Sequence, residues 1–302
     1  MEIGIVGLGR MGSNMARRLA RGGVRIVAWD RDKAACTGLA DEPGVECAEG
    51  LADLAVLLTG ERVILIMLPA GAPTQGAIDD LLPLLSVNDT LIDGGNAFYK
   101  DSMSRALELS QRGLRFVDAG VSGGIHGLAN GYCLMLGGTP KAVEHFAPFA
   151  RILAPGAQTG WMHCGPSGSG HFSKMIHNGI EYGMMQAFGE GFALLAGRKD
   201  FAIDLAQLAE TWRHGSVVRS WLLDLTAEAL SEDEKLAAVA PVVADSGEGR
   251  WTALESIEQG TPAPVITMAL MSRFSSQGKS DYARRLLAMM RAKFGGHAVT
   301  RS

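Results

Sequence analysis

Short apolar runs that alternate with amphipathic stretches fill the first half of the chain. Five of these runs predict strands, at residues 3–6, 25–29, 63–68, 90–93 and 115–119. Between the first two, Met15 and Leu19 recur at helical spacing, and they predict a helix over residues 12–21 that ends at Gly22. Strands separated by helices are typical of βαβ units, so this half predicts a mostly parallel sheet.

The alternation stops near residue 165, where a different pattern begins. Residues 167–196 contain no proline and predict one long helix. Further helical segments are predicted around residues 202–214, 217–230, 252–258, 264–276 and 281–294. We therefore expect an α/β chain, with a sheet-containing domain at residues 1–165 and an all-α domain at 166–302.

Composition and charge narrow the function classes. The chain has 302 residues, of which 47% are hydrophobic, and two buried cores are expected at this length. Its 28 basic and 32 acidic residues give a net charge of −4, which argues against a nucleic-acid binder. The N-terminus lacks a basic region before an apolar segment, and no apolar run reaches the roughly 18 residues of a membrane span. We expect a cytoplasmic protein with no membrane partner.

The cysteines and metal-ligand residues show no binding pattern. Cys36, Cys47, Cys133 and Cys164 are irregularly spaced and form no CxxC pair. This spacing disfavours a disulfide framework or a zinc site, and it predicts reduced thiols. Carboxylates and imidazoles also lack metal-ligand spacing, so no metal is expected.

A glycine-rich turn directly follows the first predicted strand. It reads Gly7-Leu8-Gly9-Arg10-Met11-Gly12 and opens the first predicted helix. In such a turn the first glycine permits the sharp bend, the second admits the pyrophosphate, and the third lets helix and strand pack closely. The helix start then holds the phosphates through its N–H groups and dipole. The context favours a Rossmann-type dinucleotide-binding domain over an ordinary strand–turn–helix.

Asp30 bears on the choice of cofactor. It lies 18 positions after Gly12, at the end of the second strand, where a carboxylate accepts hydrogen bonds from the adenosine ribose and repels a 2′-phosphate. Arg31 is placed to stack on adenine or to bind a phosphate. We expect NAD as the cofactor, with NADP weaker. Leu68 and Pro69, after the third strand, are expected to line the ribose and nicotinamide, although a simple loop is equally compatible with them.

Five polar residues share one stripe of the long predicted helix. Lys174, His177, Asn178, Glu181 and Tyr182 fall at i, i+3, i+4, i+7 and i+8, within about 140° of the helix circumference. The rest of this helix is apolar, and burying such a stripe is costly unless its groups find partners. An internal hydrogen-bond network would provide them, but so many ionisable groups favour a reaction site.

These segments resemble the 6-phosphogluconate dehydrogenases, in their short bacterial form, within the β-hydroxyacid dehydrogenases. The resemblance rests on the glycine turn, on Asp93-Gly94-Gly95-Asn96, on residues 118–124, which read DAGVSGG, and on residues 174–183, which read KMIHNGIEYG. It covers essentially the whole chain. The resemblance implies a decarboxylating oxidoreductase that acts on a phosphorylated sugar acid and needs no metal.

The resemblance also implies residue roles. It makes Lys174 the general base and then the acid, and Glu181 the acid that protonates the enediol carbon. It assigns the substrate to Asn96, Ser122, Gly123, Gly124, His177, Asn178, Tyr182 and Arg273, and Asn96 borders the cofactor as well. The C-terminal run from Arg291 to His297 matches a tail that, in the family, completes a neighbouring subunit's site. A homodimer or homotetramer is therefore implied, although a frayed basic end is the simpler interpretation.

One departure concerns the phosphate. Long-form members carry a Lys and a Thr for it in a Lys-Gly-Thr-Gly-Lys-Trp stretch, where this chain has Ser246 and Glu248 instead, with Arg250 as a potential substitute. The sequence leaves phosphorylated and free gluconate both open. It also leaves open another β-hydroxyacid dehydrogenase, of the 3-hydroxyisobutyrate or tartronate semialdehyde type, and a non-catalytic NAD-binding sensor.

Overall fold

The computed structural model describes residues 1–295, 298 and 300. The chain forms two compact units, Met1–Met175 and Ile176–Ser302. Helix α8 (Ser169–Gly197) starts in the first unit and continues into the second. Each unit is described by itself.

The first unit is built on one eight-stranded sheet with the order β3-β2-β1-β4-β5-β6-β7-β8. Its strands are β1 (Glu2–Val6), β2 (Arg25–Trp29), β3 (Val45–Cys47), β4 (Val63–Ile66), β5 (Thr90–Asp93), β6 (Arg115–Ser122), β7 (Cys133–Gly138) and β8 (Trp161–Gly165). All neighbours pair in parallel except β6 and β7, which are antiparallel. The five predicted strands are confirmed, whereas β3, β7 and β8 had not been predicted.

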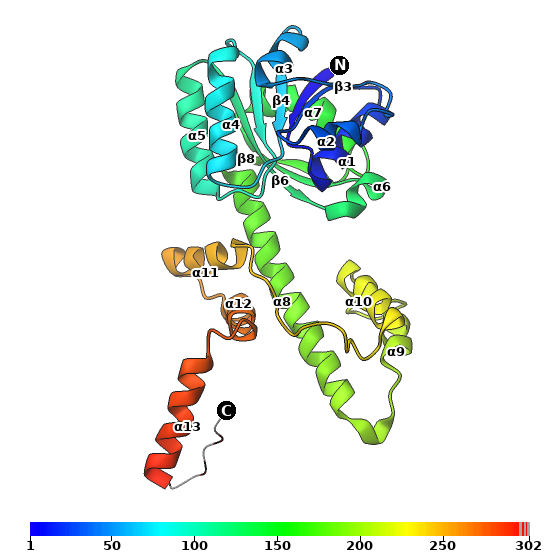
Figure 1. Ribbon diagram of the computed structural model, residues 1–302, viewed down its shortest axis with the longest axis vertical. Helices are drawn as coiled ribbons and strands as arrows, with labels where there is room; N and C mark the ends of the chain where they lie inside the picture. Colours follow the sequence, from blue (N-terminus) through cyan, green and yellow to red (C-terminus); the bar gives the residue numbers. More distant parts are fainter. Residues whose placement is uncertain (296–297, 299, 301–302) are drawn as a thin grey trace. The chain divides into compact units, whose positions relative to one another are not determined.

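Helices cover both faces of this sheet, so its strands are apolar on both sides (Figure 1). The helices are α1 (Arg10–Arg21), α2 (Lys33–Thr37), α3 (Leu51–Leu57), α4 (Ala72–Leu81), α5 (Tyr99–Gln111), α6 (Gly127–Asn130) and α7 (Pro140–Leu153). Met15 of α1 and Phe146 of α7 pack with Ile5 on one face. Leu54 of α3 and Ile78 of α4 belong to the core on the other. The Rossmann-type α/β fold is confirmed.

The second unit contains helices and irregular segments but no strand in its described part. Beyond α8 it contains α9 (Leu205–Trp212), α10 (Trp221–Glu232), α11 (Glu248–Gln259), α12 (Pro264–Ser276) and α13 (Asp281–Gly295). A short 3-10 helix follows α8 at Lys199–Phe201, and two others belong to the first unit, at Leu82–Leu84 and Gly124–His126. Phe192, Leu205 and Leu223 form one core, and Tyr182 with Leu270 belongs to a second. The predicted long helix and the all-α second half are confirmed.

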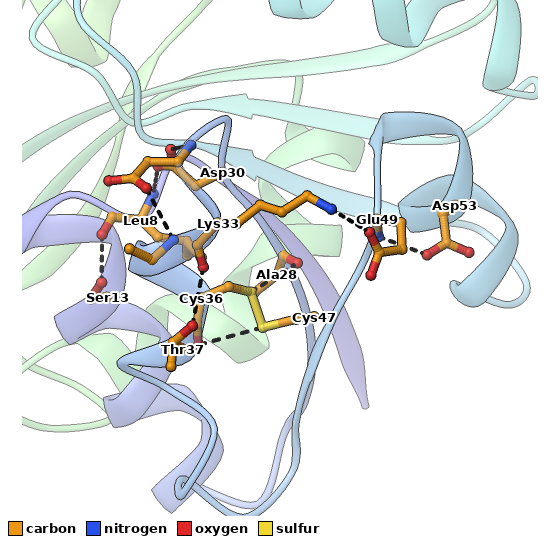
Figure 2. Close-up of a disulfide and its surroundings, with 12 residues drawn as sticks. Leu8, Ser13, Ala28, Asp30, Lys33, Cys36, Thr37, Cys47, Glu49 and Asp53 are labelled. Atoms are coloured by element: carbon orange, nitrogen blue, oxygen red, sulfur yellow. Dashed lines mark hydrogen bonds and ion pairs between the residues drawn. A yellow bond between two sulfur atoms is a disulfide. The ribbon is translucent and has the colours of Figure 1, made fainter.

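The prediction of four reduced thiols was wrong. Cys36, in α2, and Cys47, at the end of β3, form a disulfide with their Cα atoms 6.1 Å apart (Figure 2). The two lie only 11 positions apart, but the short strand β3 was not foreseen, and its pairing with β2 is what places Cys47 beside α2. Cys133 and Cys164 are free thiols.

Among the described residues, every helix is too short or too polar to cross a bilayer.

Candidate active site

The glycine-rich turn joins β1 to α1 with almost no spare room. Gly7 has φ of +97°, which favours glycine, and a Cβ there would lie 2.6 Å from the Met67 carbonyl oxygen. A Cβ on Gly12 would lie 1.9 Å from the carbonyl oxygen of Gly7, so only glycine lets α1 start this close to β1. The structure therefore provides the tight bend and the close packing that the sequence predicted for these two positions.

The middle glycine of the turn faces open space instead. No atom of the described chain lies within 4 Å of a Cβ built on Gly9. Gly9 is also the N-cap of α1, and within the described residues no side chain caps this helix start and no acid lies in its first turn. Backbone N–H groups and the positive end of the helix dipole are thus available to an anion. These residues fit the pyrophosphate of a dinucleotide.

Asp30 lies next to this turn, at the end of β2. One of its oxygens accepts a hydrogen bond from the Leu8 N–H at 2.6 Å, and the other accepts one from the Asp32 N–H at 2.8 Å (Figure 2). A carboxylate has about four acceptor positions, so lone pairs remain for ribose hydroxyls. Arg31, the adjacent residue, is exposed. The structure thus brings the Leu8 backbone next to Asp30, the residue that the sequence predicted to bind the adenosine ribose.

Two further loops lie at the carboxyl ends of neighbouring parallel strands. Leu68, half-buried, and Pro69, exposed, follow β4. After β5, the buried Asp93 accepts hydrogen bonds from the Gly95 N–H at 3.1 Å and from Arg105 at 2.9 Å. This buried ion pair fixes the turn that presents the exposed Asn96. Ligands of open α/β sheets bind at such strand ends.

Lys174 lies directly against β6. A Cβ on Gly120 would come within 2.5 Å of the Lys174 Cβ, so the glycine lets α8 contact the strand. The buried Asp118 carboxylate holds the start of α8 by accepting hydrogen bonds from the N–H groups of Gly168, at 2.7 Å, and His171, at 2.9 Å. The same strand ends at Ser122, which precedes Gly123 and Gly124. Lys174 and the turn Ser122–Gly124 thus both adjoin strand β6.

Cys133 is a neighbour of this group that sequence reasoning missed. Its Cα is the partner of Ser122 in the β6–β7 pairing. Burial raises the pKa of the Cys133 thiol, while the charge of Lys174 acts in the opposite direction. Cys133 is exposed, and a thiol with a raised pKa is protonated at neutral pH. Only the antiparallel pairing of β7, which the sequence did not predict, reveals its position.

Four polar groups of the second unit form a connected series. His177 Nδ1 lies 3.0 Å from Asn178 Oδ1 and 3.9 Å from Glu181 Oε2. Asn178 Nδ2 donates to Glu248 Oε1 at 2.7 Å. His177, Asn178 and Glu181 are half-buried, whereas Glu248 is 3% exposed. The sequence predicted the first three as neighbours on α8, but it gave Glu248 no role.

Tyr182 is the centre of a separate polar group in this unit. The Tyr182 hydroxyl lies 3.2 Å from Ser246 Oγ, and the Arg273 guanidinium stacks 3.4 Å from the centre of its ring. Within the described residues no carboxylate pairs with Arg273. Arg250, by contrast, forms an ion pair with Asp245. Arg273 therefore keeps the unbalanced charge that a phosphate needs, and the charge of Arg250 is already matched.

Two predicted residues lie near the C-terminus. Arg291 is exposed on α13. His297 lies outside the described residues. Nothing in the described part of the chain brings Arg291 to the groups above, and its assignment to a neighbouring subunit's site stays a prediction.

In residues 1–295, 298 and 300, no three His, Cys, Asp or Glu side chains are grouped as metal ligands.

Family models match both halves of the chain. The NAD binding domain of 6-phosphogluconate dehydrogenase matches residues 2–163, and the 6-phosphogluconate dehydrogenase C-terminal domain matches residues 170–299.

Individual relatives agree with the family models. The NAD(+)-dependent, decarboxylating 6-phosphogluconate dehydrogenase of Haloferax volcanii is 42% identical over 303 residues, covering 100% of this chain and 99% of that protein. The decarboxylating enzyme of Escherichia coli is 36% identical over 292 residues, which cover 93% of this chain but 62% of that longer protein. The structure of Plasmodium falciparum 6-phosphogluconate dehydrogenase, described with its cofactor NADP+ and its substrate, aligns with a TM-score of 0.85 at 26% identity and covers 100% of this chain and 66% of that one. Since both domain models and a relative of equal length match, this chain belongs to the 6-phosphogluconate dehydrogenase family.

Proposed function

We propose that this chain catalyses the NAD-dependent oxidative decarboxylation of 6-phosphogluconate to ribulose 5-phosphate and CO₂. One observation carries the proposal: α8 is a single continuous helix, and it holds Lys174, Asn178 and Glu181 at the spacing the sequence predicted. Residues 1–165 would bind the cofactor, and residues 166–302 would contribute substrate groups and subunit contacts. Membership of the family supports this division.

The proton chemistry follows from the residue types. NAD, when bound, supplies the acceptor for the hydride that leaves C3 of the substrate. Neutral Lys174 accepts the proton of the C3 hydroxyl at Nζ. The resulting ammonium then donates to the C3 carbonyl oxygen, and this stabilises the electrons left when CO₂ departs. Glu181, in its protonated form, then delivers a proton to C2 of the substrate, which becomes C1 of ribulose 5-phosphate, and the C3 hydroxyl returns its proton to Lys174. Lys174 and Glu181 thus carry out the proton transfers of the reaction.

The remaining residues would bind the substrate by its two ends. The turn Ser122–Gly124 offers a hydroxyl and backbone N–H groups to the carboxylate, and Asn96, His177 and Asn178 serve the hydroxyls. Tyr182 and Arg273 serve the phosphate. The unmatched charge of Arg273, stacked on the Tyr182 ring, favours phosphorylated over free gluconate, although Ser246 and Glu248 replace the phosphate ligands of the long form.

Assembly and location belong to the same proposal. A homodimer or homotetramer would allow Arg291 and His297 to complete a neighbouring subunit's site. A cytoplasmic location follows from the proposed substrate, because a sugar acid that carries both a carboxylate and a phosphate charge does not cross a lipid bilayer unaided.

A matrix of substrates and cofactors tests the function. We expect 6-phosphogluconate with NAD to yield NADH and CO₂ in equal amounts, and gluconate to react at least tenfold more slowly. NADH without CO₂ from 3-hydroxyisobutyrate, or from glycerate, the reduced form of tartronate semialdehyde, would instead favour another β-hydroxyacid dehydrogenase. No NADH from any of these acids, with NAD binding retained, would leave the NAD-binding sensor as the function.

Asp30→Ala is expected to weaken the binding of NAD and to reduce the preference of the protein for NAD over NADP. Loss of one charged hydrogen-bond partner is worth about 1.5–3 kcal/mol, so the KM for NAD should rise by about tenfold or more. The exposed Asp41 provides a control of equal charge in Asp41→Ala. The measurement is kcat/KM for both cofactors, and an unchanged NAD-to-NADP ratio in Asp30→Ala would remove this carboxylate from cofactor selection.

A further inference from the structure

Glu248 is a buried acid without a role in the chemistry proposed above. It is the first residue of α11 and is 3% exposed. A carboxylate in the first turn of a helix is stabilised by the helix dipole. Its side chain nevertheless extends to α8, where Oε1 lies 2.7 Å from Asn178 Nδ2. A buried charge held in this way calls for an explanation beyond helix capping.

The contact fixes the orientation of the Asn178 amide. An ionised carboxylate can only accept hydrogen bonds, so the atom that faces Glu248 must be the NH₂ group of the asparagine. A rotated amide would place its oxygen against a carboxylate oxygen, and the two would repel each other. The Asn178 Oδ1 atom is therefore directed away from Glu248, where it lies 3.0 Å from His177 Nδ1.

The amide orientation in turn determines the tautomer of His177. Because Asn178 Oδ1 is an acceptor, the facing Nδ1 of His177 must carry a hydrogen. The neutral imidazole then has its lone pair on Nε2. Glu181 Oε2, 3.9 Å from the same Nδ1, also favours a proton there. A neutral His177 of this tautomer accepts a hydrogen bond from a substrate hydroxyl at Nε2 and cannot donate one.

We propose that Glu248 is a positioning residue, which orients the Asn178 amide and thereby keeps the His177 proton on Nδ1. The proposal rests on the proposed function only in naming a sugar acid hydroxyl as the group that His177 Nε2 receives. It also assigns a role to the acid that stands where the long form has threonine. Glu248 would orient side chains that bind the substrate and would not itself contact the phosphate.

The tautomer is measured directly by ¹⁵N NMR of histidine-labelled protein. Spectra at about pH 8.5, two units above the ordinary pKa of histidine, report neutral imidazoles. The His177→Gln variant identifies the His177 signals. We expect the Nδ1–H form in the unaltered protein and a shift toward the Nε2–H form in Glu248→Leu. Glu248→Gln keeps an oxygen acceptor and should retain the Nδ1–H form. This measurement needs no turnover, so it stands even if the substrate proposal fails.

Kinetics separate positioning from mere stability. Glu248→Leu should raise the KM for 6-phosphogluconate at least fivefold, whereas the Kd for NAD and the KM for NAD should change less than twofold. Glu228→Gln, an exposed acid of α10, is the control and should match the unaltered protein. The Nε2–H form in the unaltered protein would overturn the proposal without any variant. So would a folded Glu248→Leu with an unchanged tautomer and an unchanged substrate KM.

Discussion

Lys174→Met is expected to abolish NADH formation while NAD binding remains intact. Methionine keeps much of the length and apolar character of lysine but has no proton to exchange. The amine is assigned two successive tasks, removal of the hydroxyl proton and donation to the carbonyl oxygen. General acid–base catalysis contributes about 10²–10⁴-fold to a rate, so kcat should fall by at least about 1,000-fold. The measurement is single-turnover NADH formation with saturating 6-phosphogluconate.

The control for this variant is Lys141→Met, which removes an exposed lysine from α7. It should retain full turnover and the same Kd for NAD. Lys174→Met should also keep that Kd, because the glycine turn and Asp30 are untouched. Turnover within tenfold of the unaltered protein would show that another group removes the proton, and the base assignment would be wrong.

Gly12→Ala is expected to destroy the dinucleotide site and to destabilise the first unit. The new Cβ would lie 1.9 Å from the Gly7 carbonyl oxygen, which is a backbone atom and cannot swing aside. Either α1 or the turn must move. Overpacking of this kind costs about 1–3 kcal/mol or more, and the phosphate-binding N–H groups move with the helix. We expect the Kd for NAD to rise by at least about 100-fold and the thermal midpoint to fall.

Gly9→Ala gives a matched contrast three residues away. Its Cβ would meet no atom of the described chain within 4 Å, so the fold should be unchanged while the added methyl blocks the approach of the pyrophosphate. Gly76→Ala, on α4 and equally uncrowded, should bind NAD normally and gain about 0.5–1 kcal/mol of stability. Equal thermal midpoints for Gly12→Ala and Gly9→Ala would contradict the role assigned to close packing at Gly12.

The sequence predicted the strands that are continuous apolar runs and missed the strands with weaker patterns. Strands β2 and β5 were predicted residue for residue, because strands buried on both faces are continuous apolar runs between turn residues. Strand β3, at one edge of the sheet, has three residues, and β8, at the opposite edge, has exposed positions at Met162 and His163. Strand β7 ends in two glycines, which weaken any strand pattern. Its antiparallel direction depends on tertiary packing.

Residues of the candidate site that are close in sequence could be grouped by prediction, whereas their partners from distant parts of the chain could not. Helical spacing along α8 was sufficient to group Lys174 with Asn178 and Glu181, since neighbours on a helix follow from sequence alone. The partners of these residues come from far along the chain. Glu248 is 70 positions from Asn178, and Cys133 joins the site through an unpredicted strand pairing. The disulfide between Cys36 and Cys47, whose cysteines are only 11 positions apart, was missed because the pairing of β3 with β2 was not predicted.

The absence of a side chain at Gly120 has a consequence for how the amine of Lys174 moves. Because the backbone of α8 rests against β6 there, that turn of the helix cannot shift inward, and the strand behind it cannot yield. The amine can therefore follow the changing shape of a reacting molecule only by rotation about the bonds of its own side chain. Proton exchange at this position therefore requires rotamer changes of the Lys174 side chain and no movement of the backbone of α8.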